Sequence, residues 1–153
     1  MFTIDAHGME RPCRKSRPLG IKSVTVRQFS DSDFKTASEY FRRGKEYQYF
    51  RCIARNDKTK RAGTYFIVEL NKSVVKLPQM MRAKISTIKS PADGVRVFFC
   101  EIPNNNRSSM AYEIYCGITS GGLHADEINA WKVELIDQSE KAICSRCSYM
   151  WDL

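Results

Sequence analysis

Apolar and polar residues alternate over several stretches of the chain, which predicts β-strands. A run rich in β-branched residues predicts a strand over 21–29, and alternation predicts two more over 94–102 and 110–119. Apolar side chains fill both faces of the stretch 94–102, so we expect a central strand there. The glycines of Ser120-Gly121-Gly122 then predict a turn.

Two further strand-like runs cover residues 47–55 and 64–71. The segment 56–63 between them is polar and rich in lysine and arginine, so the pattern predicts a β-hairpin with a long basic tip. Along these strands, aromatic and arginine side chains fall largely on the same face.

Three stretches predict helices. Asp31 and Asp33 provide N-terminal capping chemistry, and apolar residues at helical spacing follow, so we expect a helix over 31–43. A short helix from Pro78 is a second candidate, although the pattern over 84–89 also suits a strand. Residues 124–138 fit either a helix or a strand, and we favour a helix from about Ala125.

Grouped strands with a few helices, without strict alternation of strand and helix, predict an α+β fold. We expect an antiparallel sheet of about four to six strands and two or three helices. Residues 1–20 carry four cations, two prolines and two glycines without a periodic apolar stripe, and they predict a basic, flexible N-terminal arm. Residues 21–153 would then form one α+β domain.

Composition limits the class of protein. The chain has 153 residues, of which 42% are hydrophobic, and this favours a single globular domain. No apolar run approaches the roughly 18 to 20 residues of a membrane-spanning helix. The first 20 residues lack the apolar core of a secretory signal, so we expect a cytoplasmic protein.

Charge is distributed unevenly along the chain. The net charge is +8, but residues 1–96 hold 21 basic and 9 acidic side chains, whereas residues 97–153 hold 4 basic and 8 acidic ones. A basic portion of this kind favours a polyanionic partner, and the acidic portion would pack or recruit a further partner. A solvated basic surface without any ligand is the alternative.

Six cysteines do not imply disulfides in a chain without a secretion signal. Cys52, Cys100 and Cys116 lie in strand-like apolar runs, where we expect buried thiols. Only Cys144 and Cys147 have the spacing of metal ligands. A structural zinc there would need two more ligands, and the candidates are His7 and Cys13 near the N-terminus. The alternative is ordinary thiols, and we expect no cofactor.

Signatures of common enzymes are missing: the chain has no phosphate-binding glycine motif, no G-x-S-x-G and no H-E-x-x-H. His124 followed by Cys144 and Cys147 is similar in outline to the zinc-dependent nucleoside and nucleobase deaminases, a resemblance that implies a zinc site and a proton-shuttling Glu. Asp126 stands at the position of that Glu, and no proline precedes Cys144. Both departures disfavour this interpretation, and the missing signatures disfavour an enzyme of another class.

Cations and aromatic rings gathered on one surface are the strongest positive feature. Cations neutralise phosphates, and flat rings stack on unpaired bases. Candidate binding residues come from the arm, the segment before the predicted hairpin and the hairpin itself: Arg14, Lys15, Arg17, Arg42, Arg43, Tyr49, Arg51, Arg55, Lys58, Lys60, Arg61 and Tyr65. Cross-strand packing would explain the tyrosines equally well.

Two functions follow from these features. The first is a non-enzymatic binding protein whose basic surface engages nucleic acid or a nucleoprotein complex. The second is a small inhibitor or adaptor of the kind that phages and mobile elements use, which binds a host protein complex such as a nucleic-acid-guided nuclease and competes with nucleic acid for its site.

Overall fold

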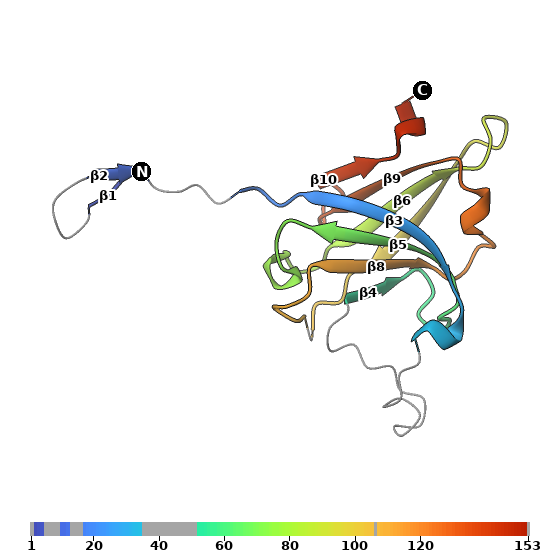
Figure 1. The fold of residues 1–153 in the computed structure, drawn as a ribbon, viewed down its shortest axis with the longest axis horizontal. Helices are drawn as coiled ribbons and strands as arrows, with labels where there is room; N and C mark the ends of the chain where they lie inside the picture. The colour runs from blue at the N-terminus through green and yellow to red at the C-terminus, as the bar shows by residue number, and fades with distance from the viewer. Residues whose placement is uncertain (1, 5–9, 13–16, 35–51, 106, 153) are drawn as a thin grey trace, which may run out of the picture.

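The computed structural model describes residues 2–4, 10–12, 17–34, 52–105 and 107–152. This part of the chain is all β, with three sheets and short 3-10 helices (Figure 1). Its strands are β1 (Phe2–Ile4), β2 (Glu10–Pro12), β3 (Ile21–Phe29), β4 (Cys52–Arg55), β5 (Gly63–Leu70), β6 (Arg82–Ile88), β7 (Val95–Glu101), β8 (Glu113–Ile118), β9 (Ala130–Ile136) and β10 (Ala142–Cys147). The 3-10 helices are η1 (Asp31–Phe34), η2 (Val74–Lys76), η3 (Ala125–Glu127) and η4 (Tyr149–Asp152).

The two larger sheets have four strands each. One is mixed, with the order β3-β5-β8-β4, and in it β4 runs parallel to β8 while the other pairs are antiparallel. The other sheet is antiparallel, with the order β10-β9-β6-β7. Strands β1 and β2 form a separate antiparallel pair.

The main hydrophobic core lies between the two four-stranded sheets, which form a β-sandwich. Alternation turns Phe66 and Val68 of β5 inward, and they face inward residues of β6 and β9 such as Ile85 and Leu135. The sheet edges also meet, because β3 contacts β10 and β4 contacts β7. The candidate site lies where β4 contacts β7.

A smaller cluster lies on the outer face of the mixed sheet. Tyr65 and Ile53 are buried there, with Phe29 and Tyr115 packed against them. The Tyr65 ring crosses β8 at Gly117, and a Cβ at this glycine would lie 2.5 Å from Tyr65 Cε1. Glycine at position 117 therefore lets a large aromatic ring lie directly on the backbone of the neighbouring strand.

The prediction of an α+β fold is wrong, because the described residues contain no helix of seven or more residues. Of the helix expected over 31–43, residues 31–34 form the 3-10 turn η1, and the rest lies outside the described residues. The stretch where a helix from Ala125 was favoured holds η3 followed by strand β9. The residues of β9 pair with those of β6 in the sheet. The alternation of apolar residues typical of a strand therefore prevails over the helical spacing of the same residues.

The helix expected from Pro78 is also absent: a turn at residues 79–80 is followed by strand β6, which bears out the alternative of a strand over 84–89. The predicted hairpin is wrong in its pairing. Strands β4 and β5 are close in sequence, yet β8 lies between them in the sheet. The strand over 94–102 exists as β7, but it is an edge strand rather than a central one, and Val95 and Val97 are exposed on it. The strand expected over 21–29 is confirmed.

Gly117→Ala tests the packing of Tyr65. The new methyl group would overlap the ring, so we expect a loss of about 1–3 kcal/mol in the free energy of unfolding, measured by urea denaturation. Gly20→Ala is the matched control, because its new Cβ would make only an ordinary van der Waals contact with Asn71. We expect its free energy of unfolding to change by no more than about 0.5 kcal/mol. Equal stability of the two variants would contradict the contact.

A candidate binding cleft between strands β4 and β7

Two adjoining clefts open where the ends of β4 and β7 meet. The large cleft has a volume of about 570 Å³ and is lined by Arg55, Asn56, Asp57, Lys58, Arg82, Phe99, Glu101 and Ser120. The small cleft, of about 390 Å³, is lined by Ile53, Arg55, Lys58, Glu101, Ile102, Pro103 and Asn104. Arg55, Lys58 and Glu101 line both. Each volume lies in the range of about 300–1,000 Å³ that is typical of small-molecule sites.

The loop after β4 is tied to the end of β8. Asn56 Oδ1 accepts hydrogen bonds from the backbone N–H of Thr119 at 2.7 Å and of Ser120 at 3.2 Å, and its Nδ2 donates to the Ser120 carbonyl at 2.8 Å. Asp57 Oδ1 accepts from the backbone N–H and the hydroxyl of Thr59, and these bonds lower the pKa of Asp57. The loop that carries Lys58 therefore has a defined conformation.

Lys58 crosses from this loop toward β7. Its Nζ lies 3.1 Å from Glu101 Oε2, and both side chains are well exposed, at 73% and 70%. An ion pair this exposed contributes little to stability, because water screens the attraction and ordering two long side chains costs entropy. Lys58 can therefore exchange this carboxylate for another anion at small cost.

Arg55 and Tyr65 have structural contacts at the base of the site. Arg55 is 8% exposed, and its Nε donates to Tyr65 Oη at 2.6 Å. The Tyr65 hydroxyl in turn donates to the Arg61 carbonyl at 2.6 Å. Tyr65 is fully buried, so its ring is not accessible for stacking on a base, contrary to the expectation from the sequence.

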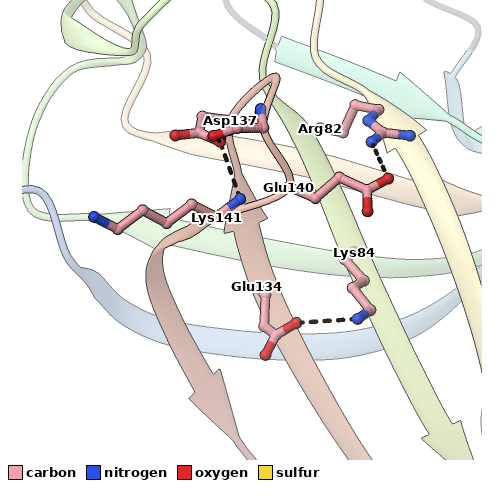
Figure 2. A network of polar contacts seen from close by, with 7 residues as sticks. Arg82, Lys84, Glu134, Asp137, Glu140 and Lys141 are labelled. Carbon is pink, nitrogen blue, oxygen red and sulfur yellow. Dashed lines mark hydrogen bonds and ion pairs between the residues drawn. The ribbon is translucent and has the colours of Figure 1, made fainter.

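Arg82 and Phe99 form the exposed side of the large cleft. Phe99 is 41% exposed on the outward face of β7, and the Arg82 guanidinium carbon lies 4.9 Å from the centroid of its ring. Arg82 Nη2 also lies 3.2 Å from Glu140 Oε1 in the turn between β9 and β10 (Figure 2). The ring contacts the guanidinium, and Glu140, whose side chain is 71% exposed, adds only a weak ion pair.

Ion pairs join the basic and acidic portions of the sequence. Lys84 pairs with Glu134 and Arg82 with Glu140 (Figure 2). Two further pairs join Lys89 to Glu127 and Lys58 to Glu101. Because β6 lies next to β9 in the sheet, carboxylates from the acidic portion neutralise cations of the basic portion. The charge asymmetry of the sequence is therefore reduced in space.

The candidate residues from the sequence are only partly gathered at this site. Arg55 and Lys58 line the clefts, Lys60 and Arg61 lie on the adjoining loop, and Arg17 is exposed before β3. The others lie outside the described residues: Arg14, Lys15, Arg42, Arg43, Tyr49 and Arg51. Arg82 and Phe99 were missed, because only the register of β6 against β7 brings them together.

The cysteine pair is not arranged as a chelate. Cys144 pairs with buried Leu135 and Cys147 with Lys132, so alternation directs the two side chains to opposite faces of β10. Within the described ranges, no group of three or more His, Cys, Asp or Glu side chains is placed to hold a metal ion. His7 and Cys13 lie outside those ranges.

The resemblance to zinc deaminases receives no support from the position of His124. Its Nδ1 accepts a hydrogen bond from the Asp126 backbone N–H at 3.3 Å, which caps the turn η3. The residues that the resemblance implies as zinc ligands are thus a capping histidine and two cysteines on a strand.

Comparisons with protein-family models, with curated proteins and with solved structures find no match for this chain. Among the described residues, the helices are all too short to cross a bilayer. The clefts therefore have to be interpreted from their own chemistry.

The core thiols give a direct test of the structure. Burial raises the pKa of Cys52 to about 11 and that of Cys100 to about 12, and it raises the pKa of Cys116 well above its usual value. At pH 8 we expect iodoacetamide to modify these three cysteines only after unfolding in urea, as mapped by peptide mass spectrometry. Rapid labelling of the folded protein at Cys100 or Cys116 would contradict their place in the core.

Proposed function

We propose that this protein is a non-enzymatic nucleic-acid-binding protein, and that the clefts between β4 and β7, with the loop beside them, contact the phosphate backbone. The observation that supports this most is that Lys58 and Arg82 line one large cleft together with a half-exposed aromatic ring, with buried Arg55 at its base and the carboxylates of Asp57 and Glu101 in the same lining. Cations that neutralise phosphates next to a ring that stacks on bases are the combination that single-stranded nucleic-acid sites use.

The loop extends the basic surface beyond the cleft. Lys60 is exposed, and no ion pair within 4 Å is found for it among the described residues, although its charge helps to lower the pKa of Asp57. A phosphate can therefore approach its ammonium group from solvent. Lys58 has the weak, exposed pair with Glu101 described above. The net charge of +8 adds a long-range attraction that raises the rate of encounter with any polyanion.

One observation favours the second function, a small inhibitor or adaptor that binds a protein. Val95 and Val97 are 54% and 45% exposed on the edge strand β7, and exposed aliphatic residues at a sheet edge are typical of protein interfaces. This function would stand in place of nucleic-acid binding if the protein showed no affinity for nucleic acid at low salt.

The double variant Lys58→Gln/Lys60→Gln tests the proposed function. Each phosphate contact contributes about 0.7–0.9 to the slope of log affinity against log salt. We therefore expect a shallower slope, reduced by one to two, and at least about tenfold weaker binding at low salt. Fluorescence anisotropy with a labelled oligonucleotide between about 50 and 200 mM salt measures both.

The matched control is Lys22→Gln/Lys76→Gln, which removes the same charge from two exposed lysines that do not line either cleft; Lys22 pairs with Glu69 much as Lys58 pairs with Glu101. We expect this control to lower affinity only slightly, through the change in net charge. Equal losses in the two double variants would show that binding depends on net charge alone, and a flat salt dependence of the unaltered protein would rule out the proposed function.

A further inference from the structure

We infer that the large cleft accepts an unpaired nucleobase, so that this protein prefers single-stranded to double-stranded nucleic acid. The inference rests on the proposed function, because it specifies the ligand of the same cleft. It follows from the surroundings of Phe99, from the way Arg82 is held, and from the size of the cleft.

Phe99 presents an aromatic surface to the cleft. Its ring is 41% exposed, although large apolar side chains are usually buried, and it lines the cleft on the outward face of β7. The Arg82 guanidinium carbon lies over this ring, 4.9 Å from its centroid, so a base would stack on the guanidinium plane or on the part of the ring that Arg82 leaves exposed. Bases stack well on both kinds of surface, because the base has a polarisable face of its own.

Arg82 is held in this position by the turn between β9 and β10. Glu140, its ion-pair partner, has a φ of 64°, a left-handed conformation that is uncommon for glutamate. The Asp137 carboxylate fixes that turn by accepting hydrogen bonds from the backbone N–H of Ser139 and from that of Lys141, the second of which is drawn in Figure 2. The turn therefore places a carboxylate within reach of Arg82, but this ion pair is weak because Glu140 is 71% exposed, and the ring of Phe99 provides the second contact that positions the guanidinium.

The cleft provides a place for a phosphate at its mouth. Lys58 lies where the large and small clefts adjoin, and its exposed pair with Glu101 can give way to a phosphate oxygen. A base on Phe99 and its phosphate at Lys58 would then lie along one face of β7, because Glu101, the partner of Lys58, stands two residues after Phe99. A cleft of about 570 Å³ has room for one unstacked base, whereas the bases of a duplex are covered by their neighbours.

Electrostatics alone predicts no preference for single-stranded over double-stranded nucleic acid. A measured preference for the single strand is therefore informative. A duplex has a higher charge density than a single strand, so a purely basic surface binds it at least as well. Tighter binding of the single strand would require a contact with the bases themselves.

The test compares a short single-stranded oligothymidine with a duplex of equal length, for the unaltered protein and for Phe99→Leu. We expect tighter binding of the single strand by the unaltered protein. Phe99→Leu keeps an apolar side chain but loses the ring, and it should weaken single-strand binding by about tenfold while duplex binding stays unchanged. Phe99→Trp should restore single-strand binding, because it keeps a stacking surface.

Tyr149→Leu is the matched control, since it removes an exposed aromatic ring that does not line either cleft. It should bind the single strand as the unaltered protein does. Circular dichroism and thermal melting establish that each variant is folded. A further measurement needs no variant. An oligonucleotide that contains 4-thiothymidine should photocrosslink to the unaltered protein at the peptide that contains Phe99.

The outcomes separate the two proposals. Equal affinity for single strand and duplex, with no effect of Phe99→Leu and no crosslink near Phe99, overturns this inference. If Lys58→Gln/Lys60→Gln still weakens binding in that case, the proposed function stands. Absence of salt-dependent binding to either oligonucleotide overturns the proposed function, and this inference with it.

Discussion

The insertion of β8 between β5 and β4 is the constraint on which the rest of the structure depends. It places Gly117 of β8 beneath the Tyr65 ring of β5, and it brings Thr119 and Ser120 within hydrogen-bonding reach of Asn56 after β4. It also leaves β4 at the edge of the mixed sheet, where it contacts β7 of the other sheet. The small outer cluster, the ordered loop and the two clefts all follow from this one strand order.

The same topology changes the meaning of the charge pattern. Residues 1–96 hold most of the cations and residues 97–153 an excess of carboxylates, but the pairing of β6 with β9 puts the two sets next to each other. Lys84 meets Glu134 in this way, and Arg82 meets Glu140 in the following turn. The acidic portion therefore partly neutralises the basic one, and only some of the cations stay available for a partner.

The candidate site shows how far a sequence can lead. Lys58 and Lys60 could be proposed because they stand in a polar, basic segment between two strands, and such segments are usually exposed loops. Tyr65 looked equally suitable as a binding residue, yet it is buried. A side chain on the outer face of a sheet is exposed only where no other residue packs on that face. Arg82 and Phe99 are 17 residues apart, and no local pattern relates them. Their contact depends on the antiparallel register of β6 and β7.

The sequence by itself determined where many of the strands lie, with β3 matching its expected bounds, because the alternation of side chains is a local property of the strand. It also determined that Cys52, Cys100 and Cys116 are core thiols. Only the tertiary structure decided between helix and strand for β9, because the deciding contacts are with β6, far away in the chain. It likewise decided which strands are neighbours. Hydrogen bonds between strands join residues that are far apart in the sequence, and no local pattern specifies which strands will pair. The edge strands, the clefts and the ion pairs therefore depend on the tertiary structure.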